Sequence, residues 1–419
     1  MANMVLVNIG MHGHVNPTLG LARALVDLGH QLSFFSTAEF AESIRETGAE
    51  FVAYPSVLGQ RTAQTATLQA AATEKGEAPP PEASAMARFI EELSLTLPNL
   101  KAEIERRRPD LVIYDFVALA AKLVADQLDI PTLKFFTTYA SNEHFNLLRE
   151  SFAKHDYPTP ERLSAVQSAI NRSLAAVGYD AIDFFATISK IDTANIVFMP
   201  KSFQPFGTTF DERFLFVGPC FRPAVVEAAL PLLPQGDGPL LLISLGSLFH
   251  EWPEFYHACF SAFGASPWRI VMSIGTRLQL EDLGPIPANF SILPHIPQLD
   301  LLQLADVFIT HGGMNSTMES LAHGVPMVVI PQIEEQRMTA QRIQEMDLGR
   351  YLRRSEVNAG SLAKAVNEVF NDAGVKGRAR GFQKEIAEAG GPQAAAAWAQ
   401  SLCQSRLPRR AETYTAVRT

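Results

Sequence analysis

Cysteine is scarce in this sequence, with three residues among 419, at Cys220, Cys259 and Cys403. They form no Cys-x-x-Cys pair and are too few to build a disulfide framework of the kind that holds small secreted domains together. We therefore expect a protein of the reducing cytoplasm.

Long apolar runs and a targeting segment are also missing. No run approaches the roughly 18 residues of a membrane-spanning helix. The first residues, MANMVLVNIG, have neither a basic start nor a cleavage site, so a signal peptide is not expected. Positive charge is in deficit as well, because 35 Lys and Arg stand against 44 Asp and Glu, for a net charge of −9. This balance argues against a nucleic-acid-binding surface.

The chain does have the length and the apolar content for two domains, since 47% of its residues are hydrophobic. Apolar runs alternate with helical patterns in two series. The first series has strand-like runs at residues 4–9, 31–36, 111–114, 132–136 and 196–199. The second has them at 240–245, 268–273, 289–293, 306–310 and 327–330. Repeated βα units predict the α/β class, with two doubly wound parallel sheets.

The connections also carry signals. Residues 220–238 are rich in Pro and Gly and predict a linker between the two series. Asn16-Pro17 is typical of a helix N-cap followed by Pro at the first helical position, which predicts a helix from there to about residue 28. Open α/β sheets bind ligands beyond the carboxyl ends of their strands. Residues that follow a strand are therefore the first candidates for function.

The most informative segment is residues 294–336. A strand at 306–310 runs into His311-Gly312-Gly313, and a helix opens at Asn315-Ser316. A helix N-terminus offers free N–H groups and partial positive charge, which favours a phosphate. Glycine lets the backbone approach the ligand, and His311, Asn315 and Ser316 can donate from their side chains. Glu319, one helical turn later, can accept from ribose hydroxyls.

This segment resembles the nucleotide-sugar signature of the GT-B UDP-glycosyltransferases, which orders a Pro-Gln pair, an HxGxNSxxE core and an acidic-Gln pair. Here they are Pro297-Gln298, His311 to Glu319, and Glu335-Gln336. The resemblance covers nearly the whole chain and is greatest to the bacterial macrolide and flavonoid glycosyltransferases, the YjiC-like branch.

The resemblance implies the GT-B fold, in which two Rossmann-like domains face each other across a cleft. We expect an N-terminal acceptor-binding domain at 1–220, a linker at 221–238 and a C-terminal nucleotide-sugar-binding domain at 239–391. A helix at the start of 392–419 should cross back to the N-terminal domain. The implied reaction is an inverting transfer of a hexose, with glucose the first choice, from a UDP-sugar to a hydroxyl of a small hydrophobic acceptor such as a flavonoid, another phenol or a macrolide.

The candidate base lies in the segment MHGHVNP, at the end of the first predicted strand. Glycosyl transfer to an alcohol requires a proton acceptor, and histidine titrates in a useful range. Matching GHVNP and YDFVA to the family assigns His14 as base and Asp115 as the carboxylate that orients it. Three other interpretations stay open. His12 and His14 could be two ligands of a metal, His14 could be structural, and Asp115 could cap the next helix.

On the donor side, several candidate residues have more than one possible role. Ser247 follows the first strand of the second series and could belong to an ordinary glycine turn. Arg277 can reach a phosphate or face solvent. His295 stands where many relatives carry a Trp that stacks on uracil, and the smaller ring leaves the preference for UDP over dTDP open. The predicted nucleotide-sugar-binding residues are Gly13, Thr138, Ser247, Thr276, Arg277, His295, Ile296, Gln298, His311, Gly313, Met314, Asn315, Ser316, Glu319, Glu335 and Gln336.

Acceptor contacts are expected from apolar residues of the N-terminal domain, each of which could equally belong to its core. The candidates are Met86, Phe89, Ile90, Phe116, Phe136, Tyr139 and Phe145. No Asp-x-Asp motif, which holds a metal on the diphosphate in many other glycosyltransferases, occurs in the chain. We therefore expect no metal and no other cofactor, with the helix N-terminus and neutral donors stabilising the leaving group.

Three other functions compete. A membrane-surface glycosyltransferase with a lipid acceptor would call for a basic apolar patch, which the acidic composition disfavours. A UDP-sugar epimerase on the same fold would need acid and base groups around C2 of the sugar. A protein that only binds nucleotide sugars would need neither His14 nor Asp115. For partners we expect small molecules alone, no stable membrane insertion, and a monomer or weak dimer.

Overall fold

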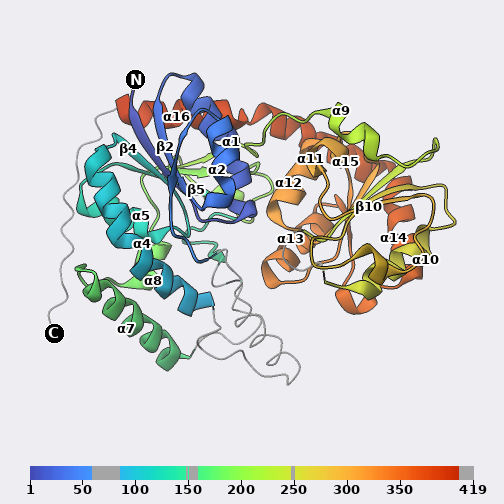
Figure 1. Cartoon of the computed structure of the whole chain (residues 1–419), viewed down its shortest axis with the longest axis horizontal. Coiled ribbons are helices and arrows are strands. Elements are labelled where there is room, and N and C mark those ends of the chain that lie inside the picture. The colour runs from blue at the N-terminus through green and yellow to red at the C-terminus, as the bar shows by residue number, and fades with distance from the viewer. Residues whose placement is uncertain (59–84, 148–149, 151–158, 247–250, 405–419) are drawn as a thin grey trace.

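The computed structural model describes residues 1–58, 85–147, 150, 159–246 and 251–404. They form two α/β domains side by side, each built on one fully parallel sheet (Figure 1). The predicted fold class is confirmed.

The N-terminal sheet has seven strands in the order β3-β2-β1-β4-β5-β6-β7. Successive residues of β1 point to opposite faces, and both faces are covered by helices. Met4 and Leu6 pack toward α1 and α16, whereas Val5 and Val7 pack toward α4 and α5. The strands are β1 (Asn3–Val7), β2 (Gln31–Ser36), β3 (Glu50–Ala53), β4 (Leu111–Asp115), β5 (Thr132–Phe136), β6 (Asn195–Val197) and β7 (Phe214–Phe216). The helices are α1 (His12–Asp27), α2 (Ala41–Glu46), α4 (Ala85–Arg107), α5 (Leu119–Gln127), α7 (Pro160–Ala176) and α8 (Phe184–Ser189).

The C-terminal sheet has six strands in the order β10-β9-β8-β11-β12-β13. Its central strands β8 and β11 are buried throughout, which explains their continuous apolar sequences. The strands are β8 (Leu240–Ser244), β9 (Arg269–Ser273), β10 (Phe290–Leu293), β11 (Val307–Thr310), β12 (Met327–Val329) and β13 (Gly349–Tyr351). The helices from the linker onward are α9 (Val226–Ala229), α10 (Pro253–Phe263), α11 (Gln298–Leu302), α12 (Met314–Ala322), α13 (Glu334–Glu345), α14 (Ala359–Asn371), α15 (Ala373–Glu388) and α16 (Gly391–Gln404).

Three strands were not predicted from the sequence: β3, β7 and β13. Each has only three or four residues and lies at the edge of its sheet. Each is partly exposed. β3 and β13 lack the continuous apolar run that marks the central strands, and β7 is apolar but has only three residues.

The predicted start of the first helix is wrong. Helix α1 begins at His12 rather than after Asn16, and Pro17 lies inside it. Proline has no N–H to donate, so the carbonyl four residues earlier, that of Gly13, receives no helical hydrogen bond from Pro17. The helix continues because Pro17 is still close to its N-terminal end, and the unused carbonyl becomes part of the site described below.

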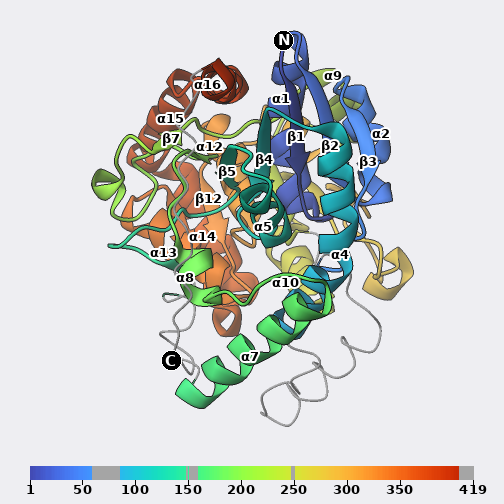
Figure 2. The same cartoon turned by 90° about the vertical axis from the view of Figure 1, so that its left-hand side faces the viewer.

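The last helix returns to the first domain. Gly390 and Gly391, with φ of 84° and 50°, lie where α15 ends and α16 begins, and their positive φ angles let the chain turn between the two helices. The Gly391 N–H donates to the Val217 carbonyl at 2.9 Å. Helix α16 then packs alongside α1 and buries Ala395, Ala396 and Ala399 in the same cluster as the core of the N-terminal sheet. Figure 2, viewed from the side of the N-terminal domain, shows α16 at the upper left, α4 to the right of the strands and α7 below them.

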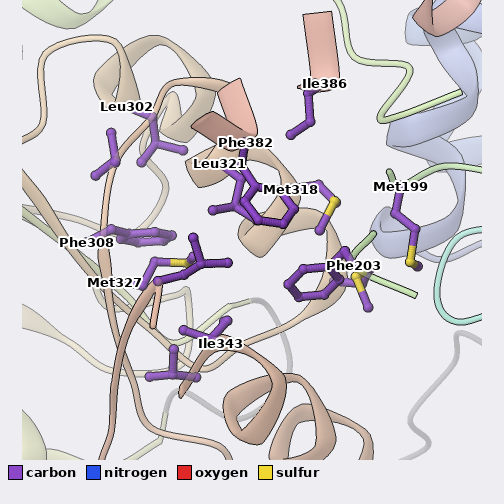
Figure 3. Close-up of a cluster of buried hydrophobic side chains, with 14 of the residues drawn as sticks. Met199, Phe203, Leu302, Phe308, Met318, Leu321, Met327, Ile343, Phe382 and Ile386 are labelled. Atoms are coloured by element: carbon purple, nitrogen blue, oxygen red, sulfur yellow. The ribbon is translucent and has the colours of Figure 1, made fainter. Parts of the chain in front are cut away.

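The two domains share one apolar core (Figure 3). Phe203, from the N-terminal domain, is fully buried with its ring between Tyr139, stacked at 6.2 Å, and Phe382 of α15, edge-on at 6.2 Å. Arg342 of α13 donates to the carbonyls of Phe203 at 3.1 Å and Ser202 at 2.7 Å. These contacts hold the carboxyl ends of the two sheets near each other.

No helix in the described part of the chain is both long enough and apolar enough to cross a bilayer.

Because Phe203 joins the domains, we expect Phe203→Ala to lower the free energy of unfolding by about 3–5 kcal/mol, the usual cost of truncating a buried Phe. Phe206→Ala is the control, since Phe206 is 62% exposed three residues away and should cost much less. Urea unfolding followed by circular dichroism measures both. Equal losses in the two variants would mean that Phe203 does not hold the interface.

Candidate active site

The candidate site lies where the carboxyl ends of the two sheets meet. On the N-terminal side, β4 ends at Asp115 and β5 leads into Thr137 and Thr138. On the C-terminal side, β11 leads through His311 into α12. Parallel strands bring these scattered residues to one edge of each sheet, as open α/β sheets do for their ligands.

His14 and Asp115 form a hydrogen-bonded pair. The His14 Nδ1 lies 2.6 Å from Asp115 Oδ2. Asp115 has no exposed surface, whereas the His14 side chain is 17% exposed. The other oxygen, Asp115 Oδ1, accepts from the Val117 N–H at 3.1 Å. The carboxylate is thus fixed from both sides, and the Nε2 edge of the imidazole is the one left for a reactant.

The surroundings of His14 make it a stronger base. Burial lowers the pKa of His14, but the charge of Asp115, its hydrogen bond and the charge of Glu335 outweigh burial, and the pKa is raised above 6.5. Phe116 lies against the imidazole with ring centroids 6.1 Å apart. Thr137 Oγ1 lies 3.4 Å from His14 Nδ1.

Two residues that the sequence analysis did not assign to the site, Asn8 and Pro17, shape the segment that carries His14. Asn8 is fully buried, and its Nδ2 donates to the His14 carbonyl at 2.8 Å and to Thr18 Oγ1 at 3.0 Å. The Gly13 carbonyl left unused by Pro17 accepts from Asn315 Nδ2 of α12 at 2.7 Å. A polar residue near the end of the apolar run at residues 4–9 was the available signal for Asn8.

The C-terminal half of the site depends on close approach of glycine backbone. Gly312 has a φ of 82°, and a side chain there would meet Val329 Cγ1 at 2.6 Å. The His311 ring lies against both Gly246 and Gly313, where an added Cβ would come within 2.6 Å of ring atoms. Burial lowers the pKa of His311 to about 4, so the ring is neutral at pH 7 and donates through one N–H.

Gln298, Ser316 and Glu319 form a connected group beside the helix N-terminus. Gln298 Nε2 donates to Glu319 Oε2 at 2.6 Å and to Ser316 Oγ at 3.1 Å. Burial is the main cause that raises the pKa of Glu319 to about 7, partly offset by the Gln298 hydrogen bond and the charge of Arg222. Arg222, from the linker, forms a two-bond pair with Asp300 at 2.9 and 2.7 Å.

The acidic-Gln pair lies at the start of α13. Glu335 Oε1 accepts from Thr138 Oγ1 of the N-terminal domain at 2.6 Å. Gln336 is buried, and its Oε1 accepts from the backbone N–H groups of Gln332 at 2.9 Å and Ile333 at 3.3 Å. Its carbonyl oxygen is therefore engaged in holding the loop before α13, and its amide N–H groups remain as donors.

The other predicted nucleotide-sugar residues are not joined to these groups by hydrogen bonds. Arg277 is exposed and pairs with Glu251 at 3.4 Å. Thr276 and His295 are exposed, and Ile296 is half-buried against the shared core. Met314 is buried in that core. Ser247 lies outside the described residues.

The predicted acceptor residues do not form one surface but lie in three groups. Phe116 and Phe136 stack on each other at 5.4 Å, with Phe116 next to His14. Tyr139 and Phe145 are buried in the core shared by the domains. Phe89 and Ile90 of α4 are half-buried against the core on the face of the N-terminal sheet that α4 and α5 cover. Met86 is the second residue of the same helix, and its side chain lies outside the described part.

Comparison with known proteins identifies the family. The C-terminal domain of the erythromycin biosynthesis protein CIII-like family matches residues 261–402. The NDP-glycosyltransferase YjiC of Bacillus licheniformis is 41% identical over 395 residues, covering 94% of this chain and 96% of the relative. Its Bacillus subtilis counterpart is 42% identical over 392 residues, covering 94% and 95%. The chain belongs to the GT-B glycosyltransferases, in their bacterial YjiC-like branch.

Solved glycosyltransferase structures support the same family. The calicheamicin glycosyltransferase CalG4 superposes with a TM-score of 0.81 at 33% identity, covering 97% of this chain and all of that one. The glycosyltransferase of kitacinnamycin also gives 0.81, at 31% identity, covering 96% and 98%. The family and the GT-B architecture expected from residues 294–336 are confirmed, and so is the enzyme class. This YjiC-like glycosyltransferase takes a nucleotide-sugar donor and a small-molecule acceptor.

Proposed function

We propose that this glycosyltransferase transfers glucose from UDP-glucose, with inversion and without a metal ion, to a hydroxyl group of a small hydrophobic acceptor. The observation that carries the proposal is the His14–Asp115 pair, with its 2.6 Å hydrogen bond, at the edge of the sheet that faces the donor segment.

The pair suits proton removal from an alcohol. With Nδ1 engaged by Asp115, Nε2 of a neutral His14 accepts the hydroxyl proton. The acceptor oxygen forms its bond to C1 of the sugar while the C1–oxygen bond to the diphosphate breaks, and that electron pair leaves with UDP. Attack from the side opposite UDP inverts the configuration at C1. Asp115 stabilises the imidazolium that results.

The donor is proposed to lie along the C-terminal edge. The diphosphate meets the N-terminus of α12 together with His311, Asn315 and Ser316, where free N–H groups favour an anion. Glu319 accepts from the ribose hydroxyls. Glu335 and the amide of Gln336, at the start of α13, take the sugar hydroxyls. The names of the YjiC relatives specify only an NDP donor, and the preference for uridine rests on the signature in residues 294–336.

Metal independence rests on the sequence and on the donors present. No Asp-x-Asp motif occurs. The groups nearest the proposed diphosphate position are neutral at pH 7, His311 included, and a preorganised set of neutral donors can stabilise a departing anion.

The acceptor proposal rests on Phe116, whose ring lies against the imidazole of His14. An aromatic surface beside the base favours a flat or apolar acceptor such as a flavonoid, another phenol or a macrolide. Relatives that cover most of the chain are named demethyllactenocin mycarosyltransferase, from Streptomyces fradiae, and oleandomycin glycosyltransferase, from Streptomyces antibioticus. The three cysteines are free, which supports our assignment to the reducing cytoplasm.

The first test of the proposal is His14→Ala. Loss of a general base should reduce the transfer rate by roughly a hundredfold or more, while calorimetry shows UDP affinity near that of the wild type. The acceptor should be an ordinary alcohol, because a very acidic phenol needs little help in losing its proton. A variant that retains most of its transfer activity would disprove the role of His14.

A second test uses the pKa of Glu319, which is about 7 in the free protein. Ribose hydroxyls donate to the ionised carboxylate, so binding favours that form. Affinity for UDP-glucose should therefore fall as pH falls from 8 to 6, and binding near pH 7 should release a proton. Calorimetry in two buffers of different ionisation enthalpy measures the release. Glu319→Gln should remove both effects, and their persistence in that variant would contradict the ribose assignment.

A third test concerns metal. Transfer in EDTA should proceed at nearly the rate seen with magnesium. A complete loss of activity in chelator that a divalent ion restores would overturn the metal-independent mechanism. Partial stimulation by magnesium would leave it standing, because magnesium can assist the release of UDP.

A further inference from the structure

Two adjacent threonines connect the candidate base to a carboxylate of the other domain. Thr137 and Thr138 follow β5 directly and are both 5% exposed. Thr137 Oγ1 lies 3.4 Å from His14 Nδ1, and Thr138 Oγ1 donates to Glu335 Oε1 at 2.6 Å. One dipeptide of the N-terminal domain therefore contacts both the base and the first turn of α13.

The charges around His14 are few and of one sign. Asp115 reaches it from β4, and Glu335 acts on it from α13 in the C-terminal domain. His12, two residues before His14, is turned to Glu39 instead, at 3.5 Å. Among the residues that the structure describes, no cation is one of the groups that act on His14. Two carboxylates from two domains thus favour a positive charge on this imidazole.

We propose that Glu335 is a positioning residue for proton transfer: its carboxylate, held by Thr138 next to the threonine that contacts His14, stabilises the imidazolium that forms when His14 takes the acceptor proton. Asp115 fixes the orientation of the ring, and Glu335 adds charge from the side of the sugar. This role is additional to the contact of Glu335 with sugar hydroxyls, and it rests on the assignment of His14 as base.

The strength of the base then depends on the contact between the domains. Asp115 belongs to the same domain as His14 and stays with it, but Glu335 approaches only while α13 lies against Thr138. The base is then strongest when the two halves of the site are together, which is also when a donor sugar would lie within reach of an acceptor.

The test is a titration of His14 in the ligand-free, full-length protein. With carbon-13-labelled histidine, His14 is identified among the ten histidines as the resonance that disappears in His14→Gln. Glu335→Gln keeps an oxygen that can accept from Thr138 but removes the charge. We expect the midpoint of the His14 titration to move to lower pH in Glu335→Gln. Correspondingly, the acid limb of the pH profile of kcat/KM should move to lower pH, because without the Glu335 charge His14 is a weaker base and is protonated only at lower pH.

Glu334→Gln is the matched control. It removes the same charge from the neighbouring residue, which pairs with Arg337 at 2.8 Å and is not among the groups acting on His14. Its His14 midpoint should stay at the wild-type value. A midpoint that does not move in Glu335→Gln, or that moves equally in Glu334→Gln, overturns the proposal.

The part played by Thr138 is tested by a double-mutant cycle. If Thr138 holds Glu335 in place, the effect of Glu335→Gln on the His14 midpoint shrinks in a Thr138→Val background. A full effect in that background overturns the part assigned to Thr138. The titration needs no turnover, so it is separate from the function proposed above: transfer that survives His14→Ala would contradict the assigned base, whereas an unmoved midpoint would contradict only the role of Glu335.

Discussion

The apolar core that both domains share around Phe203 determines how the halves of the site face each other. Phe203 packs against Phe382 of α15, and its carbonyl is held by Arg342 of α13. Close packing of this kind resists small shifts, because side chains in a core have few alternative arrangements. The two hydrogen bonds across the site, Asn315 to Gly13 and Thr138 to Glu335, are then made between groups whose backbone positions are already set.

The base depends on a buried charge that would be costly alone. Asp115 has no exposed surface, and a buried carboxylate without partners is strongly destabilising. His14 and the Val117 N–H satisfy its two oxygens. The same pairing that makes the carboxylate tolerable also fixes the imidazole, since a ring with Nδ1 bonded to Asp115 presents Nε2 outward. The hydrogen bond between His14 and Asp115 therefore both stabilises the fold and orients the base.

The parts of the fold and the site that could be predicted from the sequence are those that depend on local interactions. Buried parallel strands have continuous apolar runs, so the central strands and the residues that follow them, such as Asp115 and His311, were predictable. Edge strands such as β13 have no such run and were missed. Tyr139 shows the limit for single side chains: its aromatic character suits a pocket wall, yet it is buried against Phe203, which comes from a segment more than 60 residues later.

Contacts between the domains were the least predictable part. The sequence gives no local signal that Thr138 will bond to Glu335, because the two residues are 197 positions apart. The error at Asn16-Pro17 has a related cause. A proline near a helix start was assigned to the first helical position, its commonest place, but the helix begins five residues before Pro17. The carbonyl that this leaves without a helical partner is satisfied by Asn315, from a domain that the local pattern does not describe.

The two halves of the site differ in the charge of their side chains. Burial keeps His311 neutral at pH 7 and raises the pKa of Glu319 to about 7, so the groups around the N-terminus of α12 carry little negative charge when an anionic donor binds. Around His14, in the N-terminal half, carboxylate charge comes from Asp115 of the same domain and from Glu335 of α13. In the proposed transfer a proton moves toward the carboxylates while negative charge moves toward the diphosphate. The two halves are thus suited to opposite charges, and each is arranged before the reaction begins, which is the condition under which fixed dipoles and charges lower a barrier.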